Sequence, residues 1–211
     1  MLFKDTVETS TLELLKALQD ATLLKDFHLA GGTSLALQIG HRKSIDLDLF
    51  TPQDFDVQTM LEFLEQNFDF YSDYTTHNTI KGSIQSVKVD FIAHKYQNVE
   101  NILKTEGIRI YTIPDIAAMK LNSIAGNGTR SKDFIDIYFI LKTHKIEQLL
   151  DYYKTKYRQR NVLHLLKSLV YFDDITTSDW PHIILEKDLT LSKIKKEISL
   201  AVKRYSDELM E

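Results

Sequence analysis

Apolar and polar residues alternate most strictly over positions 44–49, which read SIDLDL. Successive side chains of a strand point to opposite faces, so this alternation predicts a β-strand with three apolar side chains on one face. Asp46 and Asp48 then share the other face, where two like charges repel one another. A bound cation would remove this repulsion, and the strand is therefore the first candidate for chemistry.

Other patterns predict mixed secondary structure in the first half of the chain. Leucines at helical spacing predict an opening helix, and a second apolar stripe predicts another. The expected helices cover residues 6–24 and 55–68, and the expected strands cover residues 27–30, 68–74, 79–84, 87–91 and 108–112. Paired glycines at 31 and 32 predict a turn that leads into a short helix of about two turns.

The second half contains helical patterns only. Pro114 suits a first helical position, Gly126 suits a helix end, and Ser131 suits an N-cap. The expected helices cover residues 114–126, 131–142, 146–157, 160–171 and 191–209. We therefore expect an α/β (α+β) fold, in which a small mixed sheet flanked by helices forms a domain of residues 1–112. A helical domain of residues 113–211 follows.

Composition excludes several classes of site. The chain has no cysteine, which rules out disulfides, zinc–thiolate sites and thiol nucleophiles. A net charge of −4 argues against coating nucleic acid through bulk electrostatics, but a local basic patch could still bind RNA. No apolar run approaches 18 residues and the first ten lack the apolar core of a signal peptide, so we expect a cytoplasmic protein without a membrane segment.

The acidic strand follows a segment that is suited to phosphate. Gly31 and Gly32 allow the backbone to approach a ligand closely, and the helix N-terminus beyond them favours anions. Mg²⁺ is usually held by one or two carboxylates together with substrate phosphates, so Asp46 and Asp48 are candidate metal ligands. The alternative for this pair is a solvent-exposed strand face. Asp90, on the polar face of the 87–91 strand, is a candidate third ligand or an ordinary surface residue.

Three charged residues of the helical half are also candidates. Lys120 lies on the apolar stripe of its helix, where it either reaches nucleotide phosphates or extends to the surface. Asp133 and Asp136 are three residues apart and share a helix face. Asp133 could simply compensate the helix dipole. Asp136 lies among apolar residues, and its partner is Lys120, Arg130 or a bound nucleotide.

Several polar residues have two open interpretations. Thr33 and Ser34 either cap the short helix or bind phosphate oxygens, and Ser44 is either positioned by Arg42 or faces the substrate. Residues 152–160 interleave aromatic and basic side chains, which suits either RNA contact or a solvated helix face.

Taken in order, these segments resemble the AbiEii-type nucleotidyltransferases, which are toxins of type IV toxin–antitoxin systems. That family is related to the MenT toxins and lies within the DNA-polymerase-β-like nucleotidyltransferase superfamily. The similar blocks are GGTSLAL at 31–37, RKSIDLD at 42–48, VKVDF at 87–91, Lys120, RSKDFID at 130–136 and YFDD at 171–174.

The resemblance implies a nucleotidyltransferase fold and transfer of a nucleoside monophosphate from an NTP, with release of pyrophosphate. Asp46, Asp48 and Asp90 would hold Mg²⁺ (or Mn²⁺) and, with Lys120 and Asp136, form the catalytic set. The implied nucleotide-binding residues are Gly31, Gly32, Thr33, Arg42, Ser44, Lys120 and Asp133. The implied acceptor is a tRNA 3′ end or another RNA, and the implied protein partner is a cognate antitoxin. Transfer to a small molecule or a protein, and NTP binding without catalysis, are the alternatives.

Overall fold

The computed structural model describes residues 1–209, in which the chain divides into two compact units. The first comprises Met1–Gln97 and Asn101–Thr112, and the second comprises Asn98–Glu100 and the chain from Ile113 onward. The first unit holds a mixed sheet with helices and the second is helical, which confirms the expected fold class. Residues 210 and 211, at the end of the expected helical domain, lie outside the described residues.

Seven strands form one sheet in the order β3-β4-β5-β2-β1-β7-β6. Their bounds are β1 His28–Leu29, β2 Leu47–Thr51, β3 Tyr71–Thr76, β4 Thr79–Ile84, β5 Val87–Ala93, β6 Leu103–Thr105 and β7 Ile108–Ile110. The pairs β2·β5 and β1·β7 are parallel, and the other neighbours are antiparallel. The central strands β2 and β5 therefore run in the same direction, so their successive residues lie side by side.

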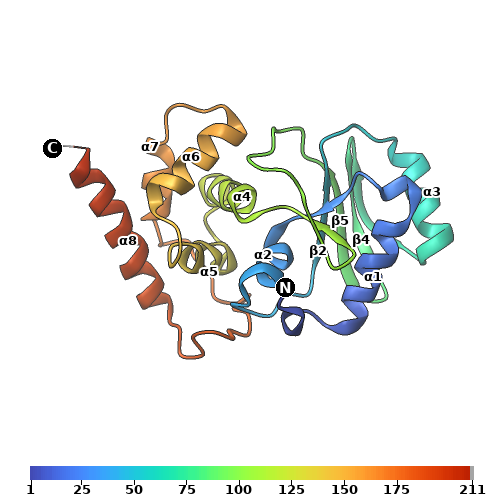
Figure 1. Ribbon diagram of the computed structural model, residues 1–211, viewed down its shortest axis with the longest axis horizontal. Helices are drawn as coiled ribbons and strands as arrows, with labels where there is room; N and C mark the ends of the chain where they lie inside the picture. The colour runs from blue at the N-terminus through green and yellow to red at the C-terminus, as the bar shows by residue number, and fades with distance from the viewer. Residues whose placement is uncertain (210–211) are drawn as a thin grey trace. The chain divides into compact units, whose positions relative to one another are not determined.

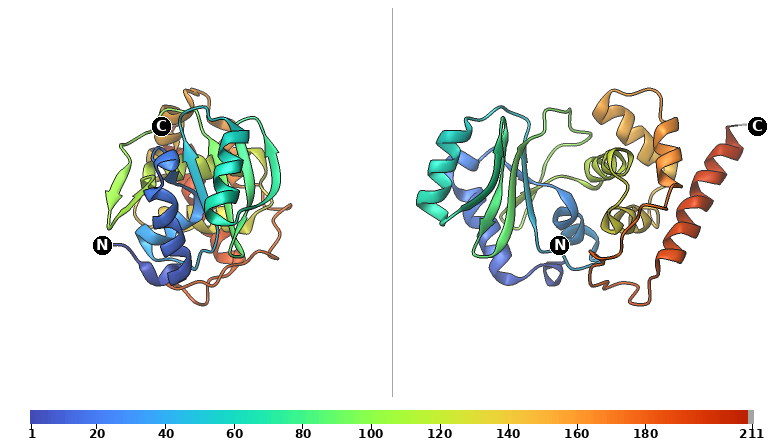
Figure 2. Two further views of the ribbon diagram at one scale, coloured as in Figure 1. Left: turned by 90° about the vertical axis from the view of Figure 1, so that its right-hand side faces the viewer. Right: turned by 180° about the vertical axis from the view of Figure 1, so that it is seen from behind.

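Three α-helices accompany this sheet: α1 Thr9–Asp20, α2 Gly31–Ile39 and α3 Val57–Phe68. Short 3₁₀ turns at Lys4–Thr6 and Thr22–Leu24 flank α1. Helices α1 and α3 run side by side over one face of the sheet (Figures 1 and 2). Leu15 and Leu18 of α1 and Leu64 of α3 bury their apolar stripe against Leu49 and Phe91 of the central strands. The core of this unit therefore lies on one face of the sheet, which leaves the other face for polar residues.

The second unit is built from five helices: α4 Ile113–Gly126, α5 Ser131–Ile140, α6 Ile146–Tyr157, α7 Leu163–Leu169 and α8 Leu191–Glu208. Helix α4 contacts α5, α6 and α7, and α8 contacts the same three helices. Helix α5 is almost wholly buried, which explains its run of large apolar residues without a polar face. Within residues 1–209, none of the helices combines the length and the apolar character needed to cross a membrane.

Several boundaries differ from those expected from sequence. The acidic strand begins at Leu47 and not at residue 44, and Ile45 is 62% exposed. The reason is that the hydroxyl of Thr33 binds the backbone carbonyl of Asp46, so this loop is tied to α2 and not to a neighbouring strand. Gly31 and Gly32 form the first turn of α2 and not a separate turn before it.

Other differences have similar local causes. The opening helix ends at Asp20 and not at residue 24. Strand β6 was not expected from the sequence, because three residues are too few to show a period. Arg130, and not Ser131, occupies the N-cap of α5, because the Ser131 hydroxyl donates to Asp179 Oδ1 at 2.7 Å.

A buried ion pair holds the second unit together. The Lys156 ammonium lies 2.6 Å from Asp115 Oδ1, and both side chains are fully buried. Asp115 also accepts hydrogen bonds from the backbone N–H groups of Val99 (3.0 Å) and Glu100 (3.1 Å). These bonds explain why Asn98–Glu100 groups with the helical unit. They also remove Lys156 from the solvated or RNA-contacting face expected for residues 152–160, because Lys156 is turned inward.

Replacing Lys156 by Ala is expected to lower the free energy of unfolding by about 3–5 kcal/mol, because it leaves the Asp115 charge buried without its counter-ion. The matched control is Lys154→Ala on the same helix, whose pair with Asp151 is at the surface and contributes little. Urea titrations followed by circular dichroism measure both effects. Equal losses in the two variants would contradict the assignment of Lys156 as a structural cation.

Candidate active site

Two carboxylates and a lysine form a row across the polar face of the sheet. Asp48 of β2 is paired in register with Asp90 of β5, and Asp90 is paired with Lys81 of β4. Residues in register on neighbouring strands project from the same face. Since Leu47 and Leu49 lie in the apolar core on the opposite face, the row lies on the polar face.

Asp90 is the unusual member of this row. The residue is 5% exposed, its Oδ2 lies 3.1 Å from the Lys81 ammonium, and its buried Oδ1 has no hydrogen-bond partner among the described residues. A buried carboxylate oxygen without a donor is costly, and such exceptions occur where a ligand or ion completes the site. This oxygen and the adjacent Asp48 carboxylate are hard oxygen donors, which fits Mg²⁺ or Mn²⁺.

Gly31 lies directly against the carboxylate of Asp48. Its φ of +64° falls in the left-handed region, and a Cβ built on it would lie 2.0 Å from Asp48 Oδ2. The preceding residue, Ala30, donates its backbone N–H to the Asp48 carbonyl at 2.8 Å. Only glycine fits there. The N-terminus of α2, where Gly32 follows and is partly exposed, is therefore held beside an acidic strand.

The hydroxyl groups expected to contact phosphate bind the protein itself. Thr33 donates to the Asp46 carbonyl and its oxygen lies 2.8 Å from the Ser44 hydroxyl, which donates to it. Both side chains are buried, and they fix the loop that carries Asp46. Ser34 donates to the carbonyl of Tyr111 at 3.0 Å, so it ties α2 to the end of β7.

The three carboxylates expected to bind metal are not equally placed. Asp48 and Asp90 are neighbours, whereas Asp46 lies in the loop before β2 and is partly exposed. Within residues 1–209, no three carboxylate or histidine side chains already converge on one point as a metal cage. Arg42 is 3% exposed and donates to the carbonyl of Lys43 at 3.0 Å, so its guanidinium helps to fix the same loop.

In the second unit, Lys120 joins two carboxylates. Its ammonium lies 2.6 Å from Asp133 Oδ1 and 2.7 Å from Asp136 Oδ2, and all three side chains are at most 9% exposed. Ser123 donates to Asp133 Oδ2 at 2.7 Å. Burial by itself raises the pKa of Asp133, but the Lys120 ammonium and the Ser123 hydroxyl outweigh it, so the pKa lies below its ordinary value. Of the partners open to Asp136 on sequence grounds, the structure shows Lys120.

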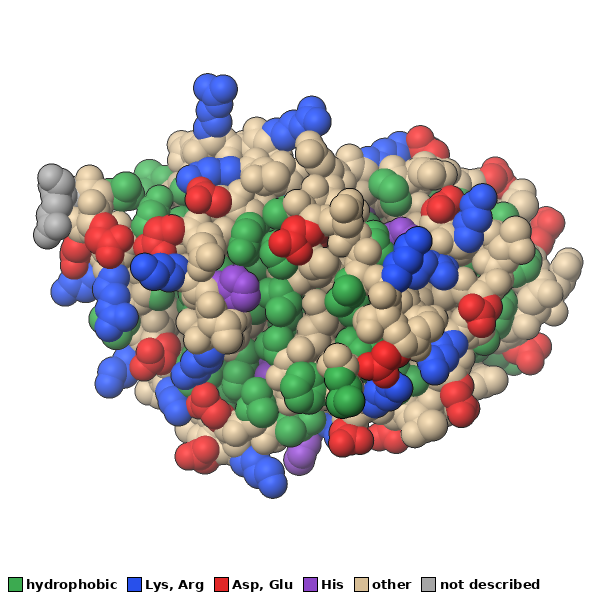
Figure 3. Space-filling view, viewed as in Figure 1, with side chains coloured by type: hydrophobic (Ala, Val, Ile, Leu, Met, Phe, Trp, Pro, Cys, Tyr) green, Lys and Arg blue, Asp and Glu red, His purple; other side chains and the backbone are tan. Residues whose placement is uncertain are grey.

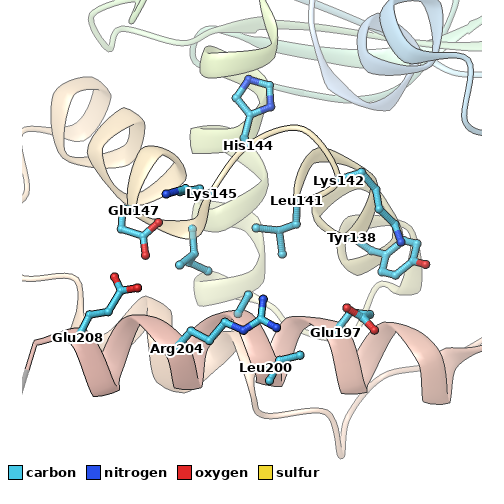
Figure 4. A pocket seen from close by; sticks show the side chains of 12 residues that line it. Tyr138, Leu141, Lys142, His144, Lys145, Glu147, Glu197, Leu200, Arg204 and Glu208 are labelled. Carbon is cyan, nitrogen blue, oxygen red and sulfur yellow. The ribbon is translucent and has the colours of Figure 1, made fainter.

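A cavity of the second unit contains none of the expected site residues. It has a volume of about 360 Å³ and lies between α8 and the segment that joins α5 to α6 (Figure 4). Its charged lining residues are Lys142, Lys145, Glu147, Glu197, Arg204 and Glu208. In sequence, a mixture of acidic and basic residues on a helix looks the same whether it lines a cavity or faces solvent. The sequence therefore did not predict this cavity.

Comparison with known proteins identifies the family of this chain. Residues 13–195 match the family described as the nucleotidyl transferase AbiEii toxin of a type IV toxin–antitoxin system. The chain belongs to the AbiEii nucleotidyl transferase toxin family. This confirms the family and the enzyme class, a nucleotidyltransferase, that the sequence motifs predicted.

Individual relatives agree with this membership of the AbiEii family. An uncharacterised protein of Aquifex aeolicus (strain VF5) is 33% identical over 168 residues, which cover 77% of this chain and 81% of that protein. A candidate nucleotidyltransferase from H. pylori has a TM-score of 0.58 at 18% identity, covering 96% of this chain and 97% of that one. The nucleotidyltransferase toxin MenT4 from Mycobacterium tuberculosis H37Rv has a TM-score of 0.57 at 14% identity, covering 95% and 86%. At these identities the two structures show a shared fold.

Replacing Gly31 by Ala is expected to reduce nucleotidyl transfer on the order of 100-fold, because the new Cβ must displace the Asp48 carboxylate and misplacement by about 1 Å has effects of this size. The matched control is Gly107→Ala, where φ is +82° but nothing lies within 4 Å of the added Cβ. Transfer rates and melting temperatures measured for both separate the close contact from backbone strain. A similar loss of transfer in the control would contradict a specific role for the Gly31–Asp48 contact.

Replacing Lys120 by Met is expected to lower the free energy of unfolding by about 3–5 kcal/mol at pH 7, with a smaller difference near pH 4. In the wild type the pKa of Asp133 lies below its unfolded value, so its contribution to stability is present above about pH 4 and is lost as the pH falls through the lowered pKa. Without the ammonium, burial raises the pKa of Asp133, so acidification protonates this carboxyl group and removes the cost of its buried charge in the variant.

Urea titrations at several pH values measure this difference, with Lys132→Met on α5 as the control. A difference that is constant with pH would show that lost packing, and not charge compensation, explains the effect.

Proposed function

We propose that this protein is a metal-dependent nucleotidyltransferase that moves a nucleoside monophosphate from an NTP to an RNA, and that the acceptor is a tRNA 3′ end. We further propose that it acts as the toxin of a type IV toxin–antitoxin system with a cognate antitoxin. The observation that carries the chemistry is the pairing of Asp48 with Asp90, whose buried Oδ1 has no donor within residues 1–209, beside the N-terminus of α2.

Asp48 and Asp90, with Asp46 from the adjoining loop, are the residues that would hold Mg²⁺ or Mn²⁺. When bound by these residues, the ion would supply neutralisation of charge on the phosphates. Thr33 and Ser44 position the Asp46 loop, and this fixed geometry is the chain's own contribution to orienting the reacting groups.

The phosphates of the NTP would lie against the first turn of α2. Gly31 and Gly32 carry no side chain that could block this approach, and a helix N-terminus favours negative charge. In the reaction, an acceptor hydroxyl oxygen bonds to the α-phosphorus and the bond to the β-phosphate oxygen breaks. Pyrophosphate leaves, and a carboxylate of the row accepts the hydroxyl proton. Arg42 is the further residue of this unit in the proposed nucleotide-binding set, where its guanidinium helps to fix the loop that carries Asp46.

The proposal of an RNA acceptor rests on the resemblance to the MenT toxins, and the chain shares its fold with the nucleotidyltransferase toxin MenT4. The net charge of −4 and the mixture of acidic and basic side chains on the face shown in Figure 3 are consistent with recognition through local contacts. A broad positive field would produce strong binding to any nucleic acid, which suits a selective acceptor less well.

Incubation with Mg²⁺, each α-labelled NTP separately and total tRNA is expected to label the tRNA with the wild type. Asp48→Asn is expected to reduce this labelling on the order of 1,000-fold, because the neutral amide removes one of the charges that would hold the ion and stabilisation by a bound metal is worth several kcal/mol. Asp73→Asn on the fully exposed strand β3 is the matched control and should label normally. Label that enters added protein or a small molecule, and not tRNA, would overturn the acceptor while keeping the chemistry.

A further inference from the structure

Three aromatic rings gather beyond the carboxylate row, where β2 and β5 end. The rings of Phe50 and His94 are stacked, with centroids 5.5 Å apart and planes 19° apart. The ring of Tyr96 leans on His94 with centroids 4.9 Å apart. We call Phe50, His94 and Tyr96 the ring cluster.

The ring cluster is on the same face of the sheet as the carboxylates. Phe50 follows Asp48 by two residues along β2, and side chains two apart on a strand share a face. Phe50 lies outside the apolar core to which its neighbour Leu49 belongs. At about 3.3 Å per residue along a strand, the ring of Phe50 begins roughly 7 Å from the position of Asp48, a separation that the sugar of a nucleotide can span.

The backbone beneath the ring cluster is fixed by hydrogen bonds. His94 donates its backbone N–H to the Thr51 carbonyl at 2.7 Å, and Ala93 donates to the Asn78 carbonyl at 2.9 Å. The Asp54 carboxylate binds both Lys95 and the Asn78 amide, which ties the loop after β2 to the loop after β5. The rings are therefore held on a connected framework, as a stacking surface requires.

The outermost ring is accessible. Tyr96 is 49% exposed although it contacts another ring, and Phe50 and His94 are partly buried. A purely structural cluster would bury its largest ring most completely, because apolar burial is what stabilises it. In the ring cluster the largest ring, that of Tyr96, is instead about half exposed to solvent.

We propose that the ring cluster stacks a nucleobase, namely the base of the nucleotide whose phosphates lie at Asp48 and Asp90. This inference rests on the proposed function, because the phosphate site defines which nucleotide is meant. The base is therefore that of the incoming NTP, and stacking of the 3′-terminal nucleotide of the acceptor is the competing outcome that the test separates. Aromatic stacking accepts every base because every base has a π-face.

The test compares NTP with tripolyphosphate, which has the phosphates of an NTP but no base. Calorimetry in Mg²⁺ with an NTP analogue that cannot transfer its nucleotide measures the dissociation constants. Tyr96→Ala is expected to weaken NTP binding between about 5- and 100-fold, the range for loss of one base–aromatic stack, and to leave tripolyphosphate binding unchanged. Tyr96→Phe keeps the ring and should bind as the wild type does. Tyr74→Ala, on the exposed strand β3, is the matched control.

The same variants are titrated with a short single-stranded RNA to identify the source of the base. Loss of NTP binding with unchanged RNA binding supports the inference. Loss of RNA binding with unchanged NTP binding overturns it in favour of stacking of the acceptor nucleotide. Unchanged binding of both overturns the inference, as does an equal loss for NTP and tripolyphosphate, which would indicate a structural role for Tyr96. If the folded wild type binds neither NTP nor tripolyphosphate, this result contradicts the proposed function itself, and the inference that rests on it is contradicted as well.

Discussion

The contact between the Gly31 backbone and the Asp48 carboxylate is the constraint on which the arrangement of the first unit depends. Strand β1 has only two residues, and α2 begins two residues after it, so the helix N-terminus must lie beside the neighbouring strand β2. A side chain at position 31 would not fit, and the positive φ would disfavour it. Because β2 and β5 are parallel and in register, the same contact also fixes the helix N-terminus relative to Asp90.

Buried carboxylates of both units have lysine partners, but the units differ in whether each carboxylate oxygen has a hydrogen-bond donor. In the second unit, Lys156 and Lys120 are themselves buried, and Asp115 and Asp133 receive further hydrogen bonds. The charges of these aspartates are therefore compensated within the protein, and the ion pairs serve mainly to fix helices relative to one another. In the first unit, the side chain of Lys81 is 40% exposed, and one oxygen of Asp90 has no donor among the described residues. The incomplete pair therefore distinguishes a site from a structural ion cluster.

The spacing of apolar residues correctly predicted those helices and strands in which buried positions recur at a regular interval. Strand β4, Thr79–Ile84, alternates buried and partly buried residues, and helix α6, Ile146–Tyr157, has an apolar stripe, and both have the bounds expected from sequence. The acidic strand begins three residues later than expected, because the hydroxyl of Thr33 in α2 binds the loop before it. A hydrogen bond between residues 13 apart leaves no trace in a local pattern.

The sequence by itself determined the family, the fold class and the residue types from which a nucleotide site could be built, because the residues within each motif stand close together in the chain. The tertiary structure alone decided which of them meet. It paired Asp48 with Asp90 through strand register, directed Lys120 to Asp133 and Asp136, and buried Lys156 in a stretch that looked solvated. It also brought Phe50 beside His94, which is 44 residues away in sequence. Contacts of this kind depend on register and packing across the fold, which the local order of residues does not encode.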